Sequence, residues 1–426
     1  MRISGPEARA LASRLFYAKG TLRERVATYG EIRDERGDLI DRGIAILNVA
    51  PHSYTGEDSL ELQLHGSTAV VREVLRAALS CGARYAQPGE FTRRAFLNGK
   101  MDLRGAAAVA DLIDAETRSA ARAALANLGG GLTASIRAAR ARLSSLLEEL
   151  AASIDFPDEV CEPDPALVRK QLEGLLAELA ALARDGELGR LVRDGVAVAI
   201  VGPPNAGKSS LLNALLQEER AIVSEVPGTT RDTIEETVVI AGVTVRLIDT
   251  AGIRTHAGRI ERAGISRARA ALAGARVAVV VLDGSEPLRT EARDLLAETA
   301  ERPRVIFCNK ADLGDRGEID DPAAVRGSTR DLRSMAALRD AIARVGWGGE
   351  VPDLERPHLA SARELDAAIA AQRALSQAIG TLSRGEPSDF IVRDLQTAFA
   401  ELGHLTGDAA SEALLDGIFA RFCIGK

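Results

Sequence analysis

The residues with the clearest chemical potential are Lys208 and Ser209, which end the run Gly202-Pro-Pro-Asn-Ala-Gly-Lys-Ser. This run fits the pattern GxxxxGK[ST], in which glycines allow main-chain N–H groups to turn toward phosphate oxygens. The apolar run Val196–Val201 precedes it and a helical pattern over 210–216 follows, so a bound phosphate would lie at a helix N-terminus. We therefore predict a nucleoside triphosphate site, with Lys208 neutralising the β- and γ-phosphates and Ser209 supplying a magnesium ligand.

A second motif, Asn309-Lys-Ala-Asp, follows the apolar run Arg304–Cys308 and would select the base. The Asp312 carboxylate can accept hydrogen bonds from both N–H groups on the edge of guanine. Adenine lacks this pair of donors and would leave a buried carboxylate unpaired, at a large energetic cost. The motif therefore predicts GTP rather than ATP. Ser328, in the run Gly-Ser-Thr, is a weaker candidate for the loop that closes over the base.

Two further motifs lie between these in the sequence. Asp249 begins the run Asp-Thr-Ala-Gly at the end of a strand pattern; it can hold magnesium through water, while the Gly252 N–H can sense the γ-phosphate. A threonine of the run Pro227-Gly-Thr-Thr-Arg-Asp can complete the magnesium shell when the triphosphate is bound. Along the sequence the four motifs begin at Gly202, Pro227, Asp249 and Asn309. Four motifs in that order resemble those of the translation-factor-related class of GTPases.

The group that orients the attacking water is less evident. Ile253 follows Asp-Thr-Ala-Gly, where Ras-type enzymes carry a glutamine, and it has no polar side-chain atom. Glu261, twelve residues after Asp249, is the best nearby candidate. Taken alone, its position fits a solvated acid in the first turn of a helix better.

The elements that would position these residues fall into compositional zones. Short strand patterns (Gly43–Val49, Ser59–Leu64) and one amphipathic helix near Ala69–Leu79 predict a mixed α+β domain over 1–98. Alanine- and leucine-rich helical patterns fill 99–192 and return over 349–426. Between them, 193–348 alternates strands and helices, which predicts a mostly parallel sheet with helices on both faces. The strands predicted there are Val196–Val201, Val238–Ile240, Val243–Asp249, Arg276–Asp283 and Arg304–Cys308. We expect a multidomain protein in which an α/β domain carrying the P-loop is inserted into a helical domain.

Composition limits the other classes of function. The net charge of −7 argues against binding nucleic acid by bulk electrostatics, and the 3% aromatic content leaves few side chains on which bases could stack. Any RNA contact must therefore be local or shared with a partner. No apolar run approaches the roughly 20 residues that cross a bilayer. The four cysteines lie far apart without a CxxC pair, which disfavours a zinc site or a disulfide framework. We expect a cytoplasmic protein that does not enter the membrane.

The flanking zones resemble the MnmE (TrmE) family of tRNA modification GTPases from end to end. The motifs that carry the resemblance are Tyr54-Thr-Gly-Glu-Asp-Ser-Leu-Glu, Pro88-Gly-Glu-Phe-Thr-Arg-Arg-Ala-Phe-Leu-Asn-Gly-Lys-Met-Asp-Leu, Ala110-Asp-Leu-Ile-Asp, Ile154-Asp-Phe-Pro-Asp-Glu and Phe422-Cys-Ile-Gly-Lys. The resemblance implies an N-terminal folate-binding domain that forms homodimers, and a helical domain with an inserted Ras-like P-loop GTPase domain. It also implies a flavoprotein partner, MnmG, in a heterotetramer that adds a carboxymethylaminomethyl or aminomethyl group at C5 of the wobble uridine, position 34, of certain tRNAs. The one-carbon unit would come from 5-formyl- or 5,10-methylene-tetrahydrofolate.

The resemblance also implies roles for individual residues. Hydrolysis would be stimulated by K⁺ bound by Asn205, Ser224, Val226 and Thr229, a cation that can stabilise charge as an arginine finger does. Ser209 and Thr230 match the Mg²⁺ ligands. Glu261 matches a water-orienting glutamate and joins Lys208 as a catalytic candidate. The resemblance therefore favours a catalytic role over the solvated helix acid that its position alone indicates. The positions matching the folate site are Arg2, Glu61, Lys100 and Lys426. The predicted GTP site comprises Asn205, Ala206, Gly207, Lys208, Ser209, Ser210, Ser224, Glu225, Val226, Pro227, Gly228, Thr229, Thr230, Asp249, Thr250, Ala251, Gly252, Asn309, Lys310, Asp312 and Ser328.

Several points stay open at the level of sequence. Family members usually carry a segment before the equivalent of Met1, so Arg2 is expected on a frayed end. Ser328-Thr329 replaces the usual Ser-Ala, and Cys423 is either a reactive thiol or a packing residue. The alternative functions are an assembly GTPase, such as a ribosome-biogenesis switch, and a folate-binding protein with a degenerate GTPase. The first would carry an RNA-binding module, and the intact Lys208 speaks against the second.

Overall fold

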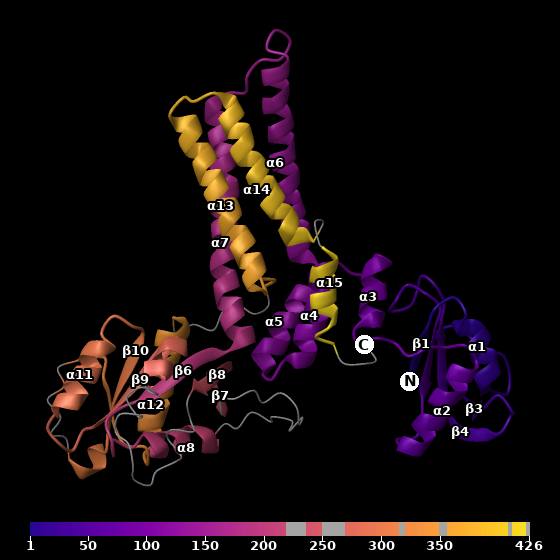
Figure 1. Ribbon diagram of the computed structural model, residues 1–426, viewed down its shortest axis with the longest axis horizontal. Helices are drawn as coiled ribbons and strands as arrows, with labels where there is room; N and C mark the ends of the chain where they lie inside the picture. The colour runs from indigo at the N-terminus through magenta and orange to yellow at the C-terminus, as the bar shows by residue number, and fades with distance from the viewer. Residues whose placement is uncertain are drawn as a thin grey trace. The chain divides into compact units, whose positions relative to one another are not determined.

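The computed structural model describes residues 1–218, 236–248, 269–314, 319, 321–348, 356–407 and 411–422 (Figure 1). The chain forms two compact units. The first contains Met1–Ala110, Leu128–Glu148 and Phe399–Lys426, and the second contains Asp111–Asn127 and Glu149–Ala398. Each unit therefore gathers segments that are far apart in the sequence.

The first unit contains an antiparallel sheet of strand order β1-β5-β4-β3-β2. Its strands are β1 (Arg2–Ser4), β2 (Phe16–Tyr17), β3 (Thr28–Arg33), β4 (Leu39–Asn48) and β5 (Ser59–Gln63). Helices α1 (Ala8–Leu15) and α2 (Thr68–Ser80) contact the sheet, and Leu60, Leu62 and Val74 form part of its buried core. The mixed α+β character predicted for this part of the chain is confirmed.

Helices from both ends of the chain complete the first unit. They are α3 (Glu90–Leu97), the first part of α4 (Leu103–Asp114), most of α6 (Gly131–Asp155), the end of α14 (Ser388–Thr406) and α15 (Glu412–Phe419). Phe419 and Phe422 pack in one buried cluster with Ala106 and Ala110. The last described residues of the chain are therefore anchored beside α4.

The second unit contains a six-stranded sheet of order β11-β10-β9-β6-β8-β7, parallel except for β7. Its strands are β6 (Val196–Val201), β7 (Glu236–Ile240), β8 (Val243–Ile248), β9 (Val277–Asp283), β10 (Arg304–Asn309) and β11 (Val325–Arg326). Strands β6 and β9 are almost continuously apolar and buried, as expected when both faces of a parallel sheet are covered. The predicted mostly parallel sheet is confirmed.

Alternating residues of β6 enter two different cores. Val198 and Ile200 belong to the core that includes residues of α8 (Lys208–Glu218) and α12 (Leu332–Trp347). Ala199 and Val201 belong to the core that includes Ala292 of α11 (Thr290–Glu298). Helices thus cover both faces of this sheet, and the loop after β6 leads into α8 on one of them (Figure 1).

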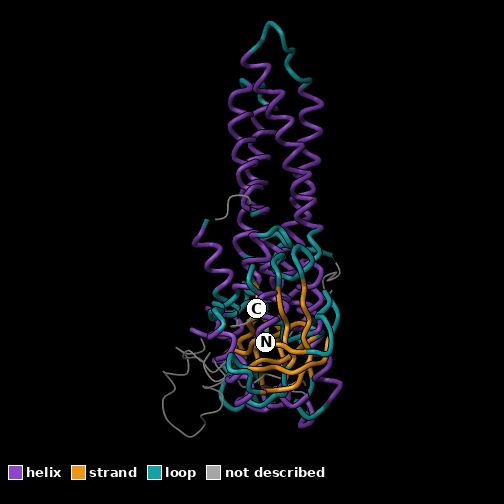
Figure 2. The backbone as a smooth tube through the Cα atoms, turned by 90° about the vertical axis from the view of Figure 1, so that its right-hand side faces the viewer, coloured by secondary structure: helices purple, strands orange, loops and turns teal. Residues whose placement is uncertain are grey.

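The sheet of the second unit is inserted between two helices that pack on each other. Helix α7 (Pro165–Asp194) leads into β6, and α13 (Ala362–Ser383) follows the sheet; the two run side by side (Figures 1 and 2). The Gln372 side chain donates a 2.7 Å hydrogen bond to the main-chain oxygen of Leu179. A Cβ on Gly189 would lie 1.8 Å from His358 Cδ2, so this glycine allows the returning chain to cross α7 closely. Helix α5 (Arg118–Leu128), apart from its last residue, also belongs to the second unit.

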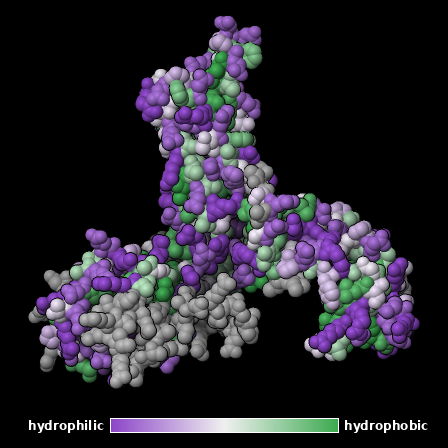
Figure 3. All heavy atoms as spheres, viewed as in Figure 1, coloured by the Kyte–Doolittle hydropathy of each residue, from purple (hydrophilic) through white to green (hydrophobic). Residues whose placement is uncertain are grey.

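Among the described residues, no helix combines the length and the apolar character needed to cross a membrane. Hydrophilic side chains cover much of the face of the long helices that is visible in Figure 3. The helices instead bury their apolar residues against one another, as Leu172 of α7 and Ala371 of α13 do.

Candidate functional site

The loop between β6 and α8 curls around its own lysine. The Lys208 ammonium donates hydrogen bonds to the main-chain oxygens of Gly202, at 2.8 Å, and Pro203, at 2.7 Å. Burial lowers the pKa of Lys208 because the charged form loses hydration. Ser209 and Ser210 occupy the first turn of α8, at the end of the helix where the dipole favours anions. A partly desolvated cation inside such a loop is suited to phosphate oxygens.

Two glycines allow this loop to pack against the sheet. Gly207 has φ +100°, and a Cβ there would lie 2.1 Å from Asn309 Nδ2. A Cβ on Gly202 would lie 2.2 Å from the main-chain oxygen of Val281. Asn205 also has a positive φ, 62°, a conformation that asparagine tolerates better than most residues, and its side chain is exposed. The amide of Asn205 is therefore available to a ligand.

Asn309, the last residue of β10, joins three segments of the site. Its Nδ2 donates to the main-chain oxygen of Ala206 at 3.0 Å, and its Oδ1 accepts a hydrogen bond from the Thr329 N–H at 3.1 Å. The Ala311 N–H donates to the Gly327 oxygen at 3.0 Å. The structure thus brings together the predicted phosphate loop, the guanine motif and the Gly-Ser-Thr loop, in which Ser328 is buried.

Asp312, the residue predicted to select the base, is accessible. Asp312 lies in a short 3₁₀ turn, η1 (Ala311–Leu313), and 39% of its side chain is exposed. Arg330 approaches its carboxylate only to 3.9 Å and is itself largely exposed, so this ion pair is weak. The Lys310 ammonium instead forms a close ion pair with Asp283, at 2.5 Å. Asp283 was missed in the sequence; its signal is its place at the carboxyl end of β9.

Much of the predicted site lies outside the described residues. These positions are Ser224, Glu225, Val226, Pro227, Gly228, Thr229, Thr230, Asp249, Thr250, Ala251, Gly252, Glu261, Cys423 and Lys426. Strand β8, which directly precedes Asp249, is the parallel neighbour of β6. The described part of the chain holds no group of three or more His, Cys, Asp and Glu residues suited to a metal ion.

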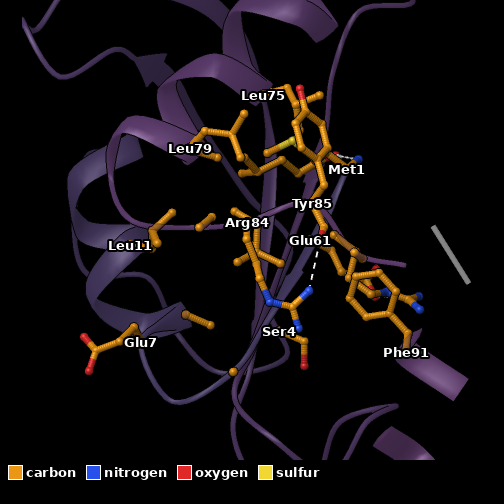
Figure 4. Close-up of a pocket in the computed structure, with 18 of the residues that line it drawn as sticks. Met1, Ser4, Glu7, Leu11, Glu61, Leu75, Leu79, Arg84, Tyr85 and Phe91 are labelled. Carbon is orange, nitrogen blue, oxygen red and sulfur yellow. Dashed lines mark hydrogen bonds and ion pairs between the residues drawn. The ribbon is translucent and has the colours of Figure 1, made fainter. Parts of the chain in front are cut away.

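A second candidate site is a cavity of about 690 Å³ in the first unit, lined by Arg2 and Glu61 together with apolar side chains such as Leu75 and Leu79 (Figure 4). Arg2 pairs with Glu61 at 2.9 Å, and its guanidinium lies over the ring of Phe91, another lining residue, 5.7 Å from the centroid. This combination of charged groups and flat apolar surfaces is suited to a polar heteroaromatic ring.

The predicted folate residues are only partly brought together. Lys100 does not line this cavity; its ammonium donates to the Pro51 oxygen at 3.0 Å. The expectation that Arg2 lies on a frayed end is wrong. Strand β1 pairs with β5, placing Arg2 opposite Glu61, and the Met1 ammonium donates to the Leu62 oxygen at 2.8 Å. The ladder and the ion pair hold this end in place.

Comparisons with known proteins cover the whole chain. Residues 1–100 match the family model of the GTP-binding protein TrmE N-terminus, and residues 103–423 match that of the MnmE helical domain. The relative named tRNA modification GTPase MnmE from Chloroflexus aurantiacus is 44% identical over 438 residues, covering 100% of this chain and 96% of the relative. Relatives of the same name from Symbiobacterium thermophilum and Trichormus variabilis are 41% and 38% identical over 100% of this chain, and over 96% and 94% of their own lengths. The chain therefore belongs to the MnmE family of tRNA modification GTPases.

Proposed function

We propose that this chain is a potassium-dependent GTPase that acts with the flavoprotein MnmG to modify C5 of the wobble uridine of certain tRNAs. The group added would be carboxymethylaminomethyl or aminomethyl, with its one-carbon unit taken from a tetrahydrofolate derivative. The observation that carries the proposal is the hydrogen bond from Asn309 to Ala206, which joins a phosphate loop to a guanine motif within a chain of this family. A homodimer, a heterotetramer with MnmG and a cytoplasmic location belong to the same proposal.

The phosphate subsite suits two metal ions of different kinds. Ser209, in the first turn of α8, would bind Mg²⁺ together with Thr230, and Mg²⁺ would neutralise phosphate charge. Asn205 offers an exposed amide oxygen, the hard donor that K⁺ prefers, and Ser224, Val226 and Thr229 would complete that set. The chain's own contribution is Lys208, which the loop holds with its ammonium turned inward.

Water activation would fall to Glu261, because Ile253 carries no polar atom where Ras-type enzymes have a glutamine. A carboxylate can orient a water molecule for in-line attack on the γ-phosphorus. Thr230, Asp249 and Gly252 would respond to the triphosphate and change the pairing of two GTPase domains. Such a change would couple hydrolysis to the modification chemistry.

The folate derivative would bind in the first unit at Arg2 and Glu61, with Lys100 and Lys426 completing the site. The cavity at Arg2 supports the pterin end of this proposal. We also propose the domain limits 1–98, 99–192, 193–348 and 349–426, with the first as the folate-binding and dimerisation domain. Helices α7 and α13 precede and follow the inserted sheet in the sequence and pack closely on each other, which supports the last three limits.

The first test is GTP hydrolysis in potassium or sodium buffer by the purified chain and by Glu261→Ala. Strong stimulation by potassium that disappears in Glu261→Ala is expected. Glu291→Ala, an exposed acid on α11, is the matched control and should keep the wild-type rate. Equal slow rates in both salts would contradict the potassium site.

A second test separates modification from a ribosome-assembly role. The chain is incubated with MnmG, the folate derivative, GTP and unmodified tRNA, and the nucleosides are measured by mass spectrometry. We expect the modified uridine with GTP and not with a non-hydrolysable analogue. Active GTP hydrolysis without any modified uridine would favour the assembly switch.

A further inference from the structure

Asp283 has both carboxylate oxygens committed at the edge of the nucleotide site. It ends β9, directly opposite Asn309 in the ladder with β10. Its Oδ2 accepts a hydrogen bond from the Lys310 ammonium at 2.5 Å, and its Oδ1 accepts from the N–H and hydroxyl of Ser285, at 3.0 and 2.6 Å. The direction of the carboxylate is therefore fixed from two sides.

The turn that follows Asp283 is itself attached to the guanine motif. The Gly284 N–H donates to the main-chain oxygen of Asn309 at 2.7 Å, and a Cβ on Gly284 would lie 3.0 Å from that oxygen. Only glycine fits there without pressing on the end of β10. The end of β9 and the start of the guanine motif thus form one rigid corner.

Lys310 leaves this corner in an unusual conformation. Its φ of 65° is rare for a residue that is neither glycine nor asparagine, so the surrounding contacts must maintain it. Its side chain is 30% exposed, and that of Asp283 is 20% exposed. Burial raises the pKa of Asp283, but hydrogen bonds from Lys310 and Ser285 outweigh it and lower the pKa below its ordinary value. The carboxylate therefore stays charged at neutral pH.

We propose that Asp283 is a positioning residue for guanine nucleotide binding, acting through Lys310. The carboxylate holds the ammonium of Lys310 so that its methylene stem presents a fixed apolar surface to the flat face of the base. Lysine stems often cover apolar surface while the charged head lies elsewhere. Without Asp283, binding has to order a long side chain with many rotamers, which weakens affinity. This inference rests on the proposed assignment of Lys310 to the nucleotide site.

The test compares Asp283→Asn with the wild-type chain in binding of a fluorescent GDP analogue and in GTP hydrolysis. The variant amide keeps the acceptor for Ser285 and loses the ion pair. We expect Kd for the analogue and KM for GTP to rise about tenfold, while kcat changes much less. Glu286→Gln is the matched control, because its ion pair with Arg289 is exposed and in the same loop. Fluorescence of the only tryptophan, Trp347, which is buried beside this sheet, checks that each variant is folded.

A double-mutant cycle with Lys310→Ala, which removes both the ammonium and the methylene stem, tests whether Asp283 acts through Lys310. In that background, Asp283→Asn should weaken binding no further. Full additivity of the two losses, or equal losses in Asp283→Asn and Glu286→Gln, would overturn the inference while leaving the GTPase assignment intact. Unchanged affinity in Lys310→Ala would remove Lys310 from the nucleotide site and overturn the inference with it.

Discussion

The side-chain amide of Asn309 donates a 3.0 Å hydrogen bond to the main-chain oxygen of Ala206, a residue 103 positions earlier in the chain. Only 2% of Asn309 is exposed, so water does not compete for this bond. The loop around Lys208 and the loop that carries Asp312 consequently form one framework before any ligand binds. Preorganisation of this kind reduces the ordering cost of binding.

Asn309→Ala should therefore weaken the phosphate subsite as well as the base subsite. The substitution leaves the Ala206 oxygen and the Thr329 N–H without this partner, at a cost of about 1–3 kcal/mol for a buried group. We expect a lower urea midpoint for unfolding of this sheet, with Trp347 fluorescence as the probe. We also expect at least tenfold weaker binding of a fluorescent GDP analogue, which corresponds to roughly the same free energy as the lost hydrogen bonds. Asn213→Ala, on the exposed side of α8, should change neither. Wild-type affinity in Asn309→Ala would contradict the framework.

Two Gly→Ala substitutions should change the stability of the protein in opposite directions. At Gly207 the new methyl group would lie 2.1 Å from Asn309 Nδ2, in a backbone conformation of φ +100°. We expect Gly207→Ala to lose measurable nucleotide binding and to destabilise the sheet by roughly 2 kcal/mol or more. Gly174 lies on the exposed side of α7, where a Cβ meets nothing within 4 Å. Gly174→Ala should stabilise the helix by about 0.5–1 kcal/mol. Thermal unfolding of both variants decides, and a gain in stability at Gly207 would contradict this geometry.

Asp312→Asn tests the choice of base. An amide presents one donor and one acceptor, whereas guanine needs two acceptors from this side chain. We expect the variant to bind GDP at least tenfold more weakly, since a hydrogen bond to a charged group contributes about 1.5–3 kcal/mol. It should bind the xanthine nucleotide better than the wild type does, because xanthine has an oxygen where guanine has an amino group. Competition titrations with both nucleotides measure the ratio, and an unchanged ratio would exclude Asp312 from base selection.

The sequence was informative where one local pattern determines the structure. Val196–Val201 was predicted as a strand with the bounds observed, because a continuous apolar run beside glycine is typical of a buried parallel strand. The meeting of the phosphate loop with Asn309 was also foreseeable, since the loop follows β6 and Asn309 ends β10, and parallel strands of one sheet end at the same edge. Asp283 was not, because its role depends on the β9–β10 register. The anchoring of Arg2 was missed for the same reason: its partner, Glu61, is 59 residues away.

Glu90, in the first turn of α3, should make the stability of that helix depend on pH. Hydrogen bonds from Arg84 lower its pKa from 4.5 to about 2; the Gln87 N–H and Arg94 add to this effect, and burial opposes it. A carboxylate with a lowered pKa in the folded state contributes stability above pH 4.5, and the contribution is lost as the pH falls toward about 2. One pKa unit corresponds to about 1.4 kcal/mol, but Arg84 is largely exposed, so on the order of 1–2 kcal/mol is expected.

Hydrogen exchange of the α3 amides, corrected for the intrinsic effect of pH, provides a local measurement in this multidomain chain. Between pH 6 and pH 3 the wild type should lose protection, because Glu90 becomes protonated in the opened helix, where its pKa is near 4.5, while the folded form must stay ionised to pair with Arg84 and Arg94. Glu90→Gln should already show the lower protection at pH 6 and change little on acidification. Glu73→Gln, whose ion pair with Arg76 is exposed on α2, should behave as the wild type does. If Glu90→Gln lost protection between pH 6 and pH 3 as steeply as the wild type, other carboxylates would have to control this helix.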